Sequence, residues 1–281
     1  MEEKKGIQEL FFPNGDFRDN VNFPDVLEEI ENLNFSQAVI ELEKLDREDK
    51  KTYELMVLAL KNYSEHKEPD FVKFLNNETE IYKNLAELGF YFQGMLEKND
   101  RENKDVQRYA HLLQKFSIAC VPKIQKETTG YPENSINGVT WLSGACLDVW
   151  NGFLADYFDT QDNYEKLYNS RVIQSKMVFA IKNHYPFEVV KSVYNVGVAN
   201  RKLGEKENAI NCFMAVIGDI QEILDQPAEY FMGNEAGMHS LDYLEWSMLN
   251  VLELDGSTKK DNIKEKLKKL NEIRNNLKPL T

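Results

Sequence analysis

Apolar residues recur every three or four positions along most of the chain, which is the spacing of one face of an α-helix. This pattern begins at Val26, Leu27 and Ile30, and it is still present at Leu267 and Leu270 near the carboxy terminus. No stretch of useful length alternates apolar and polar residues, as a half-buried strand would. The sequence therefore predicts an all-α fold of about 11–12 helices.

The helical pattern stops most clearly at residues 128–138, where Thr, Gly, Pro, Asn and Ser cluster as in a loop. Residues 1–23 are also poorly patterned. We therefore expect an N-terminal extension over 1–23, an N-terminal helical half over 24–128, and a C-terminal helical half over 139–281. The alternative is that the two halves form one continuous domain.

The chain is acidic, with 47 Asp and Glu against 34 Lys and Arg among 281 residues, a formal net charge of −13. This charge argues against nucleic acid or anionic membrane as partners, because both require a surplus of basic residues. Residues 258–281 are the exception, with eight bases and three acids, and we interpret them as a capping helix with a solvated basic face. The acidic remainder favours a basic protein or peptide partner.

The three cysteines, Cys120, Cys146 and Cys212, are widely spaced and each lies among apolar residues. Their odd number and their spacing predict buried reduced thiols, not a disulfide framework or a metal site. No apolar run follows the first five residues as in a signal peptide, and no uninterrupted apolar run approaches 18 residues. These features predict a cytoplasmic protein.

A search for chemistry finds no catalytic constellation. The four histidines share no motif, and none lies three to five residues from another His or Cys. Ser143 lies among small residues, but no strand precedes it as in a nucleophile elbow, so we expect close helix packing there. The sequence therefore predicts a protein that is not an enzyme and has no cofactor and no metal site.

Residues 192–213 carry small residues where two helices of a pair must touch, at Gly197, Ala199 and Ala209. Gly204 follows Leu203 at the expected end of the first helix, and Phe213 stands where it can fill the groove between pairs. With these features the segment resembles a tetratricopeptide repeat. The alternative is an unrelated helical array, because any antiparallel helix pair needs small residues at its crossing.

Two other segments resemble this repeat more weakly: residues 162–167, preceded by a possible first helix over 150–158, and residues 34–39. Their anchors Ala38 and Leu167, together with Ala209, are 129 and 42 residues apart, which does not fit a regular repeat. We therefore expect an irregular α–α superhelix that is similar to the tetratricopeptide superfamily.

In tetratricopeptide-like folds the first helix of each pair lines the concave, partner-binding face. In the best repeat, the resemblance implies that the partner-binding residues are Lys191, Tyr194, Asn195, Val198 and Arg201. In the preceding pair it implies Trp150, Gly152, Asp156 and Asp159. Asn195 matches the family's backbone-clamping amide, whereas Val198 departs from the asparagine of carboxylate-clamp members.

Three functions fit these observations. The first is a scaffold that holds a protein or peptide on the concave face of a helical array. The second is an acidic immunity or inhibitor protein that neutralises a basic toxin, such as a nuclease. The third is a peptide-sensing regulator, although the amino terminus shows no helix-turn-helix pattern.

Overall fold

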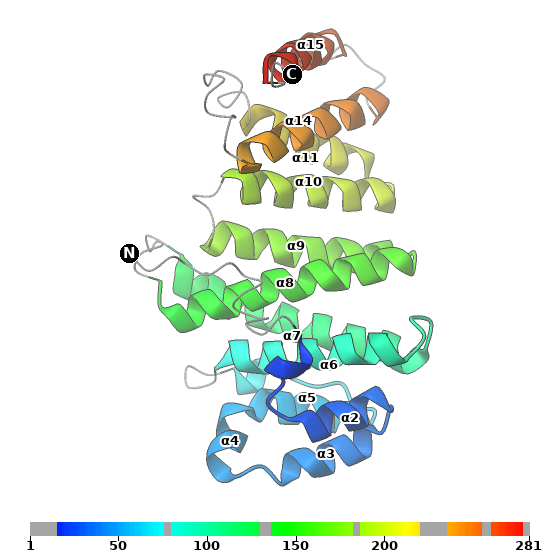
Figure 1. The fold of residues 1–281 in the computed structure, drawn as a ribbon, viewed down its shortest axis with the longest axis vertical. Helices are drawn as coiled ribbons and strands as arrows, with labels where there is room; N and C mark the ends of the chain where they lie inside the picture. The colour runs from blue at the N-terminus through cyan, green and yellow to red at the C-terminus, as the bar shows by residue number, and fades with distance from the viewer. Residues whose placement is uncertain are drawn as a thin grey trace. The chain divides into compact units, whose positions relative to one another are not determined.

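The computed structural model describes residues 16–75, 80–129, 136–181, 186–219, 235–254 and 260–277. In these ranges the chain forms twelve α-helices and two short 3₁₀ helices, and no strand (Figure 1). The expected all-α fold is therefore confirmed. The chain divides into two compact units, Met1–Gln161 (unit 1) and Asp162–Thr281 (unit 2), and each is described by itself.

The division at residue 161 differs from the boundary expected at 128–138. That loop lies inside unit 1, where the helices on either side of it pack against each other. Its residues 130–135 lie outside the described part of the chain, as do residues 1–15 of the expected N-terminal extension.

The described residues of unit 1 form two 3₁₀ helices and seven α-helices: η1 (Arg18–Asn20), α2 (Pro24–Glu31), α3 (Phe35–Glu43), α4 (Arg47–Thr52), α5 (Glu54–Ser64), η2 (Val72–Phe74), α6 (Ile81–Lys98), α7 (Lys104–Thr128) and α8 (Gly138–Thr160). Helix α6 is central, because α2, α5, α7 and α8 all pack against it. Its own side chains are buried on nearly every side, and they include Leu85, Tyr91 and Phe92.

The segment from Arg47 to Ser64 forms two helices, α4 and α5, which meet at Tyr53. A buried amide explains the break. The Asn84 side chain donates to the Thr52 carbonyl (3.0 Å) and accepts from the Met56 amide (2.8 Å), so it satisfies backbone groups on both sides of the junction.

Unit 2 contains five described helices: α9 (Tyr164–Ile181), α10 (Pro186–Leu203), α11 (Lys206–Asp219), α14 (Glu235–Leu254) and α15 (Lys260–Leu277). Helix α10 packs against α9, α11 and α14, while α14 also packs against α11 and α15. The core between these helices is formed by apolar side chains that include Ala209, Phe213, Leu244 and Leu270.

The best repeat forms the helix pair α10 and α11, and Gly197 lies at their contact, as expected. A Cβ placed on Gly197 would lie 2.8 Å from the Phe213 ring, and Ala199 and Ala209 are fully buried. Gly204 ends α10 with φ +81°, and the Glu205 amide donates to the Asn200 carbonyl (2.9 Å), as in a Schellman motif. The predicted close approach of α10 and α11 at Gly197 is confirmed, and so is the predicted helix end at Gly204.

Two further expectations concern burial. Cys120 and Cys146 are buried free thiols, as expected, while Cys212 is half-buried. Among the described helices, none combines the length and the apolar character needed to cross a membrane.

Candidate partner-binding face

Two matched stripes of side chains lie on α10 and α14. On each helix the stripe advances by four, three, four and three residues, so its members share one helix face. Each α14 position is 52 residues after its α10 counterpart. We call the ten residues the α10/α14 face: Phe187, Lys191, Tyr194, Val198 and Arg201, followed by His239, Tyr243, Trp246, Asn250 and Glu253.

The two stripes meet in register along the helices. At one end, the rings of Phe187 and His239 lie with their centroids 6.0 Å apart. At the other end, Nη2 of Arg201 lies 2.6 Å from Oε1 of Glu253. Because both ends meet between corresponding positions, α10 and α14 run parallel and side by side within unit 2.

The middle of the face is aromatic. The ring centroid of Tyr194 lies 5.1 Å from that of Tyr243 and 5.9 Å from that of Trp246, and Tyr243 and Trp246 are 5.2 Å apart. Trp246 is nevertheless 44% exposed, and its neighbour Leu249 is 47% exposed. The cluster therefore fixes three rings against one another and leaves the indole open to solvent.

The remaining end of the face is polar. The Arg201 guanidinium donates to Oδ1 of Asn250 (2.5 Å) and to Glu253, while Nδ2 of Asn250 donates to the Trp246 carbonyl (2.7 Å). Burial raises the pKa of Tyr194, although a hydrogen bond with Asn250 opposes this effect. Burial also raises the pKa of Tyr243. Both phenols are thus protonated at neutral pH, where they can take part in hydrogen bonding and ring contacts.

Four of the sequence-predicted residues belong to this face. Lys191 lies with its ammonium 6.0 Å from the centroid of the Phe187 ring, and Tyr194 and Arg201 make the contacts given above. Val198 is partly buried against the core of unit 2, so it supports the face. Asn195 is half-buried and lies one position outside the stripe, and its expected backbone-clamping role stays a prediction.

The residues predicted from the preceding pair lie on α8, in unit 1, and are described apart from this face. Trp150 is 2% exposed and packs in the core of unit 1. The expectation that it contacts a partner is therefore wrong, and its role is structural. Of the others, Asp156 is exposed, whereas Gly152 and Asp159 are half-buried.

Sequence reasoning missed the α14 half of the face. The signal was available as the 52-residue offset between Tyr194 and Trp246, repeated between Arg201 and Glu253. This offset is hard to recognise because it departs from the period of about 34 residues that is typical of tetratricopeptide repeats, and because the α14 stripe has different residue types from the α10 stripe.

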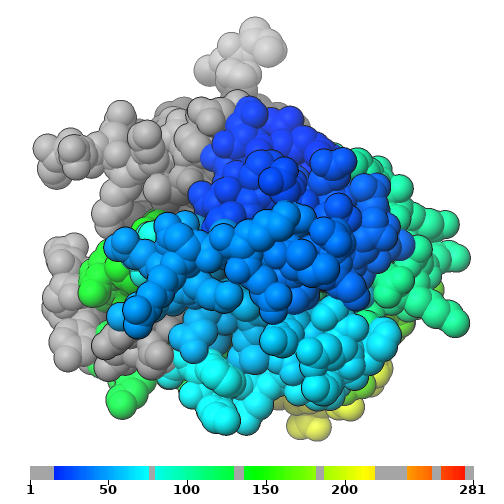
Figure 2. Space-filling model, turned by 90° about the horizontal axis from the view of Figure 1, so that it is seen from below, coloured from blue at the N-terminus to red at the C-terminus, as the bar shows by residue number. Residues whose placement is uncertain are grey.

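The acidic charge lies almost entirely in the other unit. Unit 1 carries 30 acidic and 18 basic residues, a net −12, whereas unit 2 carries 17 and 16, a net −1. Nine of the acids fall in residues 25–49, against two bases. Figure 2 shows the surface that contains these residues, formed by α2, α3 and α4 in blue.

Neither a metal site in the described ranges nor a similar protein identifies the function of the α10/α14 face. Within the described ranges, no three His, Cys, Asp or Glu side chains come together as metal ligands would. Searches against protein-family models, curated proteins and solved structures found no match to this chain.

Proposed function

We propose that this protein is a non-enzymatic scaffold that binds a protein or peptide on the α10/α14 face. The observation that carries this proposal is the aromatic cluster of Tyr194, Tyr243 and Trp246, held rigidly by two helices and open at the indole. Aromatic residues supply much of the energy of protein interfaces, because they bury a large area and lose little conformational freedom.

The packing of unit 2 supports a similarity to tetratricopeptide repeats. Helices α10 and α11 form one closely packed pair, and α14 and α15 form the next. The two first helices, α10 and α14, run parallel and present matched stripes, as the first helices of such repeats do. In this interpretation the α10/α14 face corresponds to the concave face that the sequence predicted.

The partner that we propose is basic. Unit 1 carries a net charge of −12, and such a charge attracts a basic partner over distances comparable with the Debye length. Lys or Arg side chains of the partner can then bind to the aromatic cluster, because a cation is attracted to the face of an indole ring.

Photocrosslinking in the native host tests this proposal. Benzoylphenylalanine is placed at position 246, and in a matched variant at position 179, because Phe179 on α9 is equally exposed (49%) but lies outside both stripes. We expect a discrete crosslinked partner from position 246 and not from position 179. Equal crosslinking from both positions, or none from position 246, would contradict the proposal.

The same experiment separates the alternatives. The immunity or inhibitor alternative predicts one crosslinked partner, a basic toxin such as a nuclease, bound tightly. A scaffold predicts several partners that bind more weakly, and a peptide-sensing regulator predicts a short peptide in place of a folded protein.

A further inference from the structure

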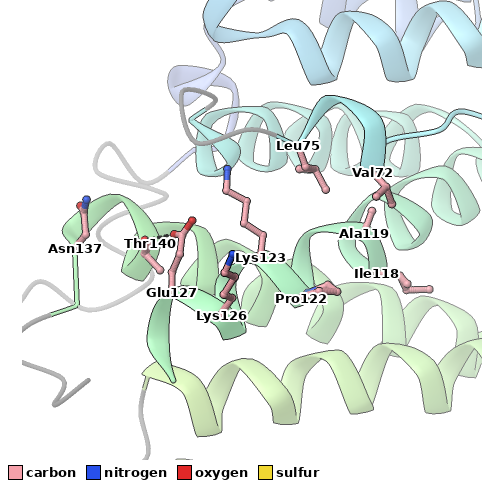
Figure 3. Close-up of a pocket in the computed structure, with 10 residues that line it drawn as sticks. All are labelled: Val72, Leu75, Ile118, Ala119, Pro122, Lys123, Lys126, Glu127, Asn137 and Thr140. Carbon is pink, nitrogen blue, oxygen red and sulfur yellow. Dashed lines mark hydrogen bonds between the residues drawn. The ribbon is translucent and has the colours of Figure 1, made fainter. Parts of the chain in front are cut away.

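A second site lies in unit 1, far in sequence from the α10/α14 face. A groove of about 910 Å³ opens between η2, the second half of α7 and the beginning of α8 (Figure 3). The apolar and the polar residues that line it lie toward different ends. Figure 3 shows Val72, Leu75, Ile118 and Ala119 toward one end, and Lys126, Glu127 and Asn137 toward the other.

The apolar end is unusually open to solvent. Val72 is 70% exposed and Ile118 is 48% exposed, although both are large apolar residues. Pro122 continues this surface along α7. Neighbouring apolar side chains that stay exposed in a concave surface mark binding sites, because burying them against a partner is favourable.

Pro122 gives the groove a polar feature at the same place. Proline has no amide hydrogen, so it cannot donate to the carbonyl four residues earlier in the helix, which is that of Ile118. Both residues line the groove. The Ile118 carbonyl thus lacks its usual helical donor.

The polar end carries more positive than negative charge. Lys123 and Lys126 line it on successive turns of α7. Glu127 is the one carboxylate among the described lining residues, and it keeps its charge while the buried hydroxyl of Thr140 donates to its Oε2 at 2.6 Å, so two cations face one anion. This end is therefore a local exception in a unit whose net charge is −12.

We propose that this groove binds a short acidic and apolar peptide segment of a partner protein. Its apolar side chains would cover Val72 and Ile118, a backbone amide would donate to the Ile118 carbonyl, and a carboxylate would pair with Lys126. The groove runs about 13 Å along α7 from Ile118 to Glu127, enough for about four extended residues. This proposal rests on unit 1 alone and does not depend on the α10/α14 face.

Peptide display on the full-length protein tests the proposal. A random 12-residue library is panned on the wild-type protein, with counter-selection against a Val72→Glu, Lys126→Glu double variant. Both side chains are exposed, so these changes should leave the melting temperature unchanged. Matched controls outside the groove are Ile40→Glu, 48% exposed on α3, and Lys104→Glu at the start of α7.

We expect recovered peptides to combine apolar residues with at least one Asp or Glu. When these peptides are synthesised and titrated, they should bind the double variant at least about tenfold more weakly than the wild type, and each control within about twofold of it. Recovery of no peptide, of peptides without an excess of acidic residues, or of peptides that bind the groove variants normally would overturn the proposal.

Discussion

Gly89 of α6 lies directly against the indole of Trp150 on α8, so closely that a Cβ at position 89 would be 2.1 Å from Cε2 of that ring. The Trp150 ring also packs edge-on against Phe90, at a centroid distance of 5.4 Å. Position 89 therefore has room only for a glycine. Trp150, which was predicted from the sequence to lie on a binding face, is a core residue of unit 1.

This contact predicts that Gly89→Ala destabilises the protein. The added methyl group forces the buried indole or the helix to move, at a cost of about 1–3 kcal/mol in the free energy of unfolding. Gly138→Ala is the control, because a Cβ there meets nothing within 4 Å. Denaturant unfolding measures both, and equal stability of the two variants would contradict the packing described here.

The crossing of α10 and α11 makes a second prediction. Ala209 is fully buried at this crossing, so Ala209→Leu should lower the free energy of unfolding by about 1–3 kcal/mol. Glu207→Leu, two positions earlier and exposed, should change it little. If thermal melting shows the same shift for both variants, Ala209 does not lie at a close crossing.

The carboxyl of Glu87 makes a third prediction, about pH. It is fully buried and accepts hydrogen bonds from the backbone amides of Asn22 and Phe23, each at 3.1 Å. Burial raises its pKa despite these bonds. The folded protein therefore binds more protons at this site than the unfolded chain does. The contribution of Glu87 to the free energy of unfolding falls as the pH rises from the usual pKa of a glutamate toward the raised pKa in the folded protein.

Glu87→Gln cannot titrate, yet its amide oxygen can still accept from the backbone amides. The stability of this variant relative to the wild type should therefore increase as pH rises across that window. Glu87→Leu, which also cannot titrate, leaves the amides of Asn22 and Phe23 without this acceptor, and should be less stable than Glu87→Gln by about 1–3 kcal/mol at every pH. Denaturant unfolding at several pH values provides the measurement, and a pH-independent difference for Glu87→Gln would refute the expectation.

The helical pattern was sufficient to predict the fold class, because the apolar residues that form one buried helix face recur every three or four positions in the sequence. The same holds for the pair α10 and α11, where Gly197, Ala209 and Gly204 each have a local steric requirement. The break at Tyr53 could not be predicted this way. It depends on Asn84, which lies about thirty residues away in the sequence and is brought there by tertiary packing.

The candidate face was predictable only in part, for a similar reason. Tyr194 and Arg201 follow from the repeat pattern, but Trp246 and Asn250 become their neighbours only when α14 packs against α10. Trp150 was misplaced because α8 is apolar around most of its circumference, so the sequence pattern does not single out one exposed face. Trp150 and the exposed Asp156 are both on that helix.

A fourth prediction concerns the charge of unit 1. If a basic partner is attracted by its net −12, the association rate constant should fall as the Debye length shrinks from about 30 Å at 0.01 M salt to about 10 Å at 0.1 M. The dissociation rate constant should change less, because it depends on the packed contact. Stopped-flow kinetics with the crosslinked partner measures both, and an association rate indifferent to salt would remove the electrostatic argument.

The most direct test of the central claim is the affinity of that partner for Trp246→Ala, measured by isothermal titration calorimetry beside Phe179→Ala. Both changes remove a partly exposed aromatic side chain from unit 2, but only Trp246 belongs to the α10/α14 face. We expect Trp246→Ala to weaken binding by about tenfold or more, and Phe179→Ala by less than about twofold. Equal affinity of the two variants would show that the partner binds elsewhere.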